Sequence, residues 1–148
     1  MRKKTLLVCS GGGHLVQLSL LSEAFAQHEV VWAVADGSQP PERIYKYCLV
    51  DANKETPAKL IKLAFQVLRV VRCEKPQLIV STGAAPGLFA ILFGRMLGAQ
   101  TLWLDSIANS AQVSLSGRLA KHLANVTLTQ WPHLAEQNKK MDYWGQVL

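Results

Sequence analysis

Short apolar runs alternate with longer amphipathic stretches along this chain of 148 residues, and this alternation limits the possible fold more than any other feature. Short apolar runs between Gly, Pro or polar residues predict strands, here at Thr5–Ser10, Glu29–Ala35, Tyr47–Asp51, Gln77–Ser81, Gln100–Leu104, Asn125–Thr129 and near Tyr143–Val147. Helical spacing predicts helices at about His14–Gln27, Pro57–Cys73, Pro86–Leu97 and Ser114–His122, and a short turn of helix after Trp131-Pro132. Because strands that alternate with helices form parallel sheets, and strands that are apolar throughout are buried on both faces, we predict one α/β domain over residues 1–148 with a doubly wound, mainly parallel sheet.

Composition and charge narrow the class of protein. Apolar residues make up 49% and charged residues 18% of the chain, which excludes an intrinsically disordered protein. Lys and Arg number 16 against 10 Asp and Glu, so the net charge of +6 indicates an anionic partner. The basic residues are not interleaved with stacking aromatic residues, so we expect no nucleic acid. No apolar run reaches the roughly 18 residues of a membrane span, and we find no secretory signal, so we expect a cytoplasmic protein.

Three consecutive glycines, Gly11, Gly12 and Gly13, lie between the first strand and the first helix. They let the backbone approach a ligand, and the helix start adds free N–H groups and the positive end of its dipole, which suits a phosphate or pyrophosphate. A dinucleotide fingerprint fits in part, since Asp36 ends the second strand but Val16 stands where the third glycine belongs. A tight turn without a ligand is the alternative.

A second loop of small residues follows the fourth strand and contains Thr82, Gly83, Ala84 and Gly87. The carboxyl ends of parallel strands meet at one edge of a sheet, so this loop should lie beside the triglycine loop. Two such loops at neighbouring strand ends predict a site for a phosphorylated ligand.

His14 and Asp105 are the candidate catalytic residues. His14 stands at the helix start, where it could donate to a phosphate oxygen, remove a proton from a bound hydroxyl, or simply face solvent. Asp105 and Ser106 follow the fifth strand at the same sheet edge. The acid could hold a sugar hydroxyl or, less readily than His14, act as the base; the alternative is a carboxylate that caps a turn or helix.

The predicted helix Pro57–Cys73 has a basic face. On a helical wheel Lys59, Lys62, Arg69 and Arg72 share one arc, Phe65 falls inside it, and apolar residues fill the opposite half. Cations beside an exposed aromatic residue are typical of a helix that lies on anionic lipid headgroups. The alternative is the ordinary solvated face of a helix that covers a sheet.

The spacing of possible metal ligands predicts no metal site. The three cysteines and four histidines form no pair with metal-ligand or redox spacing, and the sequence offers no acidic metal-binding pair. We therefore expect neither a metal nor a cofactor.

Several segments together resemble one protein family. They are Val8–Leu15 (VCSGGGHL), Ser81-Thr82-Gly83, Asp105-Ser106, Ser114–Leu119 (SLSGRL), Gln130-Trp131-Pro132 and Tyr143-x-Gly145. The chain thus resembles, over essentially its whole length, the acceptor-side subunit of split GT-B glycosyltransferases. That family includes bacterial exopolysaccharide and capsule subunits of the PssD type and the membrane-anchoring subunit of the eukaryotic dolichol-linked N-acetylglucosaminyltransferase. The N-terminal half of MurG is a more distant relative.

The resemblance implies a Rossmann-like N-terminal half of a GT-B enzyme. Such a half binds a polyprenyl-pyrophosphate-linked sugar acceptor at the inner face of the cytoplasmic membrane, while a separate donor-binding subunit holds the UDP-sugar. By carry-over, Gly12, Gly13, His14 and the Gly83–Gly87 loop would face the acceptor pyrophosphate, and Asp105 and Ser106 the acceptor sugar. The position of Asp105 is often Glu in the family.

The resemblance also implies where the partner subunit binds. The segment from Trp131 to Leu148, with Tyr143 and Trp144, would contact it. Two other functions stay open: a self-contained nucleotide-binding module, and a scaffold that recruits the donor-binding subunit to the membrane without taking part in catalysis.

Overall fold

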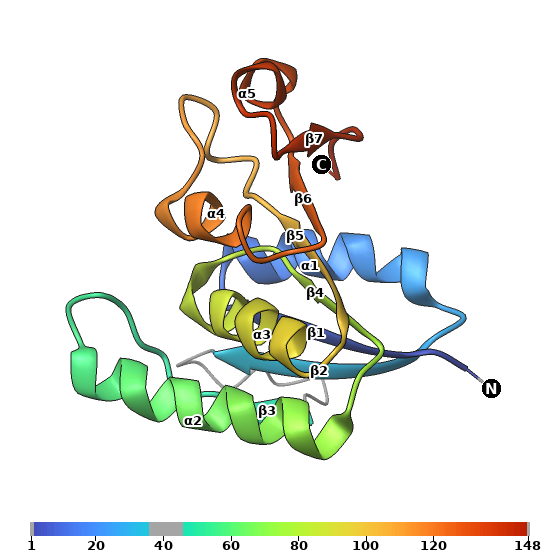
Figure 1. Cartoon of the computed structure of the whole chain (residues 1–148), viewed down its shortest axis with the longest axis vertical. Helices are drawn as coiled ribbons and strands as arrows, with labels where there is room; N and C mark the ends of the chain where they lie inside the picture. The colour runs from blue at the N-terminus through green and yellow to red at the C-terminus, as the bar shows by residue number, and fades with distance from the viewer. Residues whose placement is uncertain (1, 36–45, 148) are drawn as a thin grey trace.

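Seven parallel strands form one sheet in the order β3-β2-β1-β4-β5-β6-β7 (Figure 1). The computed structural model of the chain describes residues 2–35 and 46–147, so Asp36 and the predicted loop Gly37–Glu42 lie outside the described residues. The strands are β1 (Lys4–Ser10), β2 (Glu29–Ala35), β3 (Tyr47–Cys48), β4 (Leu78–Ser81), β5 (Gln100–Leu104), β6 (Val126–Thr129) and β7 (Asp142–Tyr143). The helices are α1 (Gly13–Leu21), α2 (Pro57–Glu74), α3 (Ala84–Met96), α4 (Leu115–Ala120) and α5 (Pro132–Gln137).

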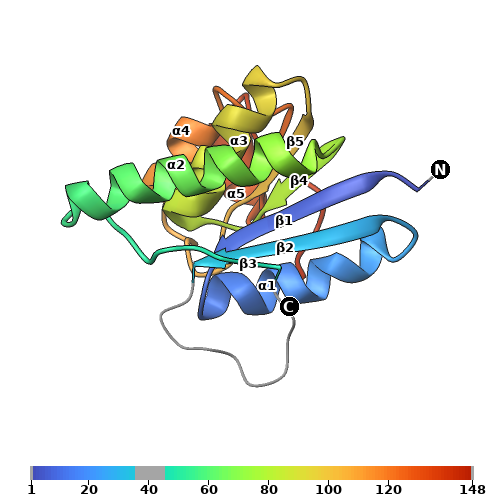
Figure 2. The same ribbon diagram turned by 90° about the horizontal axis from the view of Figure 1, so that it is seen from below.

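The sheet is covered on both faces. Side chains alternate along β1, so that Leu6 and Val8 pack into the core beneath α2 and α3, whereas Leu7 packs with Leu18 of α1. Figure 2 shows α1 on one side of the sheet and α2 with α3 on the other. The predicted doubly wound parallel sheet is therefore confirmed. The strand order reverses between β1 and β4, and this is the point at which ligands bind in such sheets.

Two glycines let α3 lie close to the sheet. A Cβ on Gly87 would collide with the Ser81 side chain, and a Cβ on Gly94 would collide with Ile79. Gly87 is buried in this contact and packs α3 against β4, and its role in binding substrate stays a prediction.

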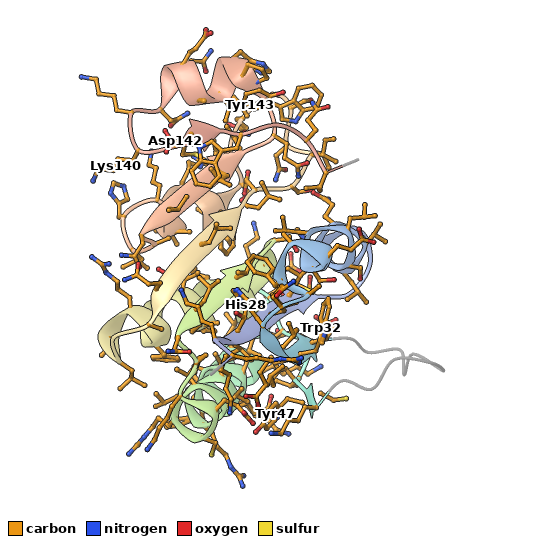
Figure 3. The ribbon with its side chains drawn as sticks, turned by 90° about the vertical axis from the view of Figure 1, so that its right-hand side faces the viewer. His28, Trp32, Tyr47, Lys140, Asp142 and Tyr143 are labelled. Carbon is orange, nitrogen blue, oxygen red and sulfur yellow. The ribbon has the colours of Figure 1, made fainter. Side chains whose placement is uncertain are left out.

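Some predicted elements are shorter in the structure than the sequence suggests. The first helix ends at Leu21 and continues as a 3-10 turn at Ser22–Phe25. The third and seventh strands have two residues each. Both are edge strands, so each has one neighbouring strand, as the positions of Tyr47 and Tyr143 at opposite ends of the sheet show in Figure 3.

A buried carboxylate fastens the β3 edge. Glu74, at the end of α2, accepts a 2.5 Å hydrogen bond from the Tyr47 hydroxyl and lies 2.6 Å from Lys46 Nζ and 3.3 Å from Lys4 Nζ. Burial by itself would raise the pKa of Glu74, but the hydrogen bonds from Lys46, Tyr47 and Lys4 outweigh it and lower the pKa to about 2. The same hydrogen bond to Glu74 raises the pKa of Tyr47 to about 12.

We expect this carboxylate to make the fold sensitive to acid. Its folded-state pKa lies below its ordinary value of 4.5, so its contribution is complete above pH 4.5 and is lost as the pH falls towards 2. The shift corresponds to about 3 kcal/mol in the free energy of unfolding. Urea unfolding from pH 6 to pH 2 should show this loss in the wild type and not in Glu74→Gln. The exposed Glu55→Gln is the control; equal acid dependence in the wild type and Glu74→Gln would refute the assignment.

Candidate functional site

The loops after β1 and β4 are hydrogen-bonded to each other at the point where the strand order reverses. The Thr82 hydroxyl donates to the His14 carbonyl at 2.6 Å, and His14 Nδ1 lies 3.0 Å from the Thr82 carbonyl. The two loops therefore meet as the sequence predicts. Thr82, however, is fully buried and has both its hydroxyl and its carbonyl in these bonds, so these two groups hold His14 in position, and binding of substrate by Thr82 stays a prediction.

The His14 side chain has a defined orientation and tautomer. A carbonyl oxygen can only accept, so Nδ1 carries the hydrogen of the bond to Thr82. In the neutral ring Nε2 then holds the lone pair. The ring is half-buried. This arrangement can take a proton from a hydroxyl group placed against Nε2.

The backbone beneath the imidazole requires glycine. Gly83 has a φ of +144°, and a Cβ there would collide with His14 Nδ1 and Cε1. The next residue, Ala84, has a φ of +67°, which is unfavourable for a residue with a side chain. Backbone strain of this kind is concentrated at functional sites. Gly83 thus makes room for the imidazole, and Ala84 starts α3 from a strained conformation.

The triglycine loop is open where a ligand would approach it. Gly12 and Gly13 are exposed, and a Cβ built on either would have no other atom within 4 Å. The first amides of a helix have no acceptor within the helix, so the start of α1 can bind an anion through its N–H groups. Gly11 differs, because its N–H donates to the Ala35 carbonyl at 3.0 Å and holds the loop to β2. That Gly11 binds substrate stays a prediction.

The Asp105 carboxylate is held firmly within the protein, and its predicted catalytic role stays a prediction. Its side chain is buried, with 1% of the residue exposed. Oδ1 accepts from Trp103 Nε1 at 3.2 Å and from the Ser114 hydroxyl at 2.5 Å, while Oδ2 accepts from the Ser114 N–H at 3.0 Å and from Asn109 Nδ2 at 3.3 Å. These four donors fill the carboxylate and fix the connection to α4.

Two buried amide side chains complete this edge of the sheet and were missed by the sequence reasoning. Gln17 of α1 and Gln130 after β6 are 3% and 0% exposed, and their side chains are 2.5 Å apart. Gln17 also donates to the Ser106 hydroxyl at 3.1 Å. Ser106 is therefore part of this network and is largely buried. Polar residues on a helix and in a loop carry no periodic signal that could have shown that these two amides meet.

The basic face of α2 is exposed as predicted. Lys59, Lys62, Arg69 and Arg72 lie on the surface, and Phe65 among them is 69% exposed. In the part of the chain that the structure describes, no helix has both the length and the hydropathy to cross a bilayer.

The C-terminal segment offers exposed aromatic residues. Tyr143 of β7 and Trp144 are 41% and 67% exposed, and Figure 3 shows Tyr143 at the end of the sheet far from Tyr47. Trp131 is half-buried instead, and its indole N–H donates to the Ile107 carbonyl at 2.7 Å. Trp131 thus packs within the chain, Tyr143 and Trp144 have exposed surface, and contact of these three residues with a partner stays a prediction.

Other parts of the surface do not add to this site. A hollow of about 440 Å³ between the ends of α2 and α3, lined by Arg72, Lys75 and Leu97 among others, includes Gln77 and Ala99, which precede β4 and β5 at the opposite edge of the sheet. Among residues 2–35 and 46–147, no three His, Cys, Asp or Glu side chains are grouped so that they could hold a metal ion.

The fold is that of one half of known two-domain proteins. MurG of Acinetobacter baumannii matches 88% of this chain with 42% of its own length, at a TM-score of 0.68 and 17% identity. The UDP-N-acetylglucosamine 2-epimerase of Rickettsia bellii matches 99% of this chain with 46% of its length, at a TM-score of 0.75 and 14% identity. These likenesses define the class: a doubly wound α/β domain of the type that forms half of GT-B proteins.

The sequence defines the family. The model of the family described as "Oligosaccharide biosynthesis protein Alg14 like" matches residues 48–147, so the chain belongs to the Alg14-like family. This is the family that the sequence motifs predict. The triglycine loop lies before the matched residues, so this match does not cover it.

The relatives are longer than the matched segments. The UDP-N-acetylglucosamine transferase subunit ALG14 of Mus musculus is 33% identical over 91 residues, which are 55% of this chain and 39% of the mouse protein. The subunit of the same name from Yarrowia lipolytica is 29% identical over 84 residues, 53% of this chain and 39% of its own length.

We expect Gly83→Ala to displace the His14 ring, because the new methyl group would occupy its place and φ would be strained. The cost in the free energy of unfolding should be at least about 1 kcal/mol, measured by urea unfolding, and the nitrogen NMR signals of the His14 ring should change. Gly13→Ala is the matched control, because its Cβ meets open space. If Gly83→Ala left both stability and the His14 signals unchanged, the tight contact would be disproved.

Proposed function

We propose that this chain is the acceptor-binding subunit of a two-component inverting glycosyltransferase. A separate subunit would bind the UDP-sugar donor. The family supports this proposal, as do the relatives named as subunits of UDP-N-acetylglucosamine transferase. The observation that carries it is the joined pair of loops at the strand-order reversal, which presents His14 Nε2 beside an open helix start.

The proposed acceptor is a sugar linked to a polyprenyl pyrophosphate. The N–H groups at the start of α1 would bind the pyrophosphate, since anions are stabilised there. His14 Nε2 would take the proton of the attacking sugar hydroxyl. The hydroxyl oxygen then forms a bond to the anomeric carbon of the donor, the bond from that carbon to UDP breaks with its electron pair, and the configuration inverts. A metal ion or cofactor has no part in this proposal.

We further propose that α2 holds the subunit on the inner face of the cytoplasmic membrane. The exposed cations Lys59, Lys62, Arg69 and Arg72 would face anionic headgroups, and Phe65 would enter the interface. Tyr143 and Trp144 would contact the donor-binding subunit. Assembly of exopolysaccharide or capsule oligosaccharides is the process we propose for this enzyme.

We expect His14→Ala to reduce turnover by about 10²-fold or more, because the hydroxyl would lose its base. The measurement is glycosyl transfer to a polyprenyl-pyrophosphate-linked sugar by this chain together with a candidate donor-binding subunit, such as the product of a neighbouring gene. His122→Ala, which alters an exposed histidine outside the site, is the control.

Three outcomes would contradict the proposal in different ways. Wild-type turnover by His14→Ala would show that His14 is not the base. Transfer from UDP-sugar at full rate by this chain alone would favour a self-contained nucleotide-binding enzyme. Full activity of a triglycine-loop variant such as Gly12→Asp in an intact complex would favour a recruitment scaffold.

We expect charge reversal on α2 to weaken binding to anionic membranes. Each cation at such a surface contributes about 1 kcal/mol, so Arg69→Glu with Arg72→Glu should lower the partition coefficient by about 30-fold or more. Cosedimentation with phosphatidylglycerol vesicles measures it. Lys139→Glu with Lys140→Glu is the control, since it changes the net charge equally at exposed positions before β7. Equal loss of binding in both double variants would indicate an effect of net charge and not of α2.

A further inference from the structure

The buried amide pair, Gln17 and Gln130, joins three segments that are far apart in the sequence. Gln17 belongs to α1, one turn after His14, and Gln130 follows β6. The third segment is the C-terminal stretch at Gln146 and Val147, which hydrogen-bonds to Gln130. Each buried amide needs hydrogen-bond partners for its oxygen and its NH₂ group, because an unpaired polar group in a protein interior is costly.

Gln17 uses its full hydrogen-bonding capacity. Its Nε2 donates to the Gly13 carbonyl at 3.3 Å and to the Ser106 hydroxyl at 3.1 Å. Its Oε1 accepts from the Ile107 N–H at 3.1 Å and from Gln130 Nε2 at 2.5 Å. A rotated amide would place NH₂ against two donors, so this orientation is fixed. Gln17 therefore holds the start of α1 to the loop after β5.

Gln130 fixes Gln17 in turn. Both hydrogens of its Nε2 are used, one for Gln17 Oε1 and one for the Asp105 carbonyl at 3.1 Å. Its Oε1 accepts the Val147 N–H at 3.1 Å, and its backbone carbonyl accepts from Gln146 Nε2 at 3.0 Å. The Asp105 carbonyl and Gln17 Oε1 set which way the Gln130 amide faces, and the Val147 N–H pairs the oxygen of that amide and ties it to the C-terminal segment. Without the Val147 N–H a buried oxygen is unpaired, which is costly, and the Gln130 side chain is held by its NH₂ group alone.

We infer that Gln130 is a positioning residue through which the C-terminal segment holds the triglycine loop in place. The chain of contacts runs from Val147 to Gln130, then to Gln17, and ends at the Gly13 carbonyl. On the proposed function, the C-terminal segment is also where the donor-binding subunit docks. A subunit that holds this segment against Gln130 would thereby order the acceptor site, so that the site is complete when both subunits are present.

The test removes a single N–H group. Val147→Pro cannot donate to Gln130, whereas the matched control Val147→Ala keeps its N–H. Hydrogen exchange is measured by NMR on the chain without a partner, at Leu15 and Val16, whose N–H groups donate to the Gly12 carbonyl, and at Ile107, which donates to Gln17. We expect exchange at these three amides to be about five-fold faster in Val147→Pro, the effect of losing one hydrogen bond.

A second variant and an internal reference make the result decisive. Gln130→Met removes the amide and keeps a similar volume, so it should accelerate exchange at the same amides. The amides of β1 report global unfolding, and their rates must be subtracted in every variant. If, after this correction, Leu15, Val16 and Ile107 exchanged equally in Val147→Pro and Val147→Ala, the inference would be overturned.

The consequence for activity separates this inference from the proposed function. In the reconstituted pair at saturating partner, Val147→Pro should raise KM for the lipid-linked acceptor by about five-fold with little change in kcat, because it disturbs the site and not the base. Faster exchange in the chain without a partner, combined with no transfer by any pair tested, would refute the proposed function and leave the link from Val147 to Gly13 standing. Glycosyl transfer by the pair, combined with unchanged hydrogen exchange in Val147→Pro, would support the proposed function and refute the link from Val147 to Gly13.

Discussion

The reciprocal hydrogen bonds between His14 and Thr82 are the interaction on which the arrangement of the site depends. They form because β1 and β4 are parallel neighbours, so their carboxyl ends come together where the strand order reverses. The His14 ring leaves no room for a side chain on Gly83, and the next residue, Ala84, has a positive φ. The fold thus stabilises a strained turn and fixes the imidazole through the hydrogen bond of Nδ1 to the backbone.

The sequence predicts the sheet well because its central strands are buried on both faces. β1, β2, β4, β5 and β6 are apolar runs, and their positions follow from this alone. The prediction is less accurate at the edges. Val147 is apolar enough to extend the last strand, yet its N–H donates to Gln130, and β7 ends at Tyr143. A tertiary hydrogen bond replaces strand pairing at Val147, and the pattern of apolar residues in the sequence does not indicate such a bond.

The candidate site is predictable in its location and less so in its roles. Glycine loops at strand ends mark the correct edge of the sheet, because backbone conformation is encoded locally. Whether a polar side chain is free depends on partners that are distant in sequence. Sequence alone leaves Asp105 either as a sugar-binding residue or base or as a carboxylate that caps a turn or helix, and only the structure shows that Ser114, Trp103 and Asn109 all donate to it. In contrast, within the described residues a hydrogen bond is seen for only one ring nitrogen of His14, which is Nδ1 with the Thr82 carbonyl.

The buried polar side chains of this protein fix the geometry of its loops, whereas its exposed aromatic side chains lie on the surface. Asp105, Gln17 and Gln130 are enclosed, so substituting one disturbs the others, and their value lies in setting one geometry for the loops. Phe65 and Trp144 are mostly exposed, so a substitution there disturbs fewer internal contacts than one in the buried network. Gln130 links the C-terminal segment to the buried network, because its side chain is hydrogen-bonded both to Val147 and to Gln17. On our inference, a change in the C-terminal segment acts on the start of α1 through these hydrogen bonds.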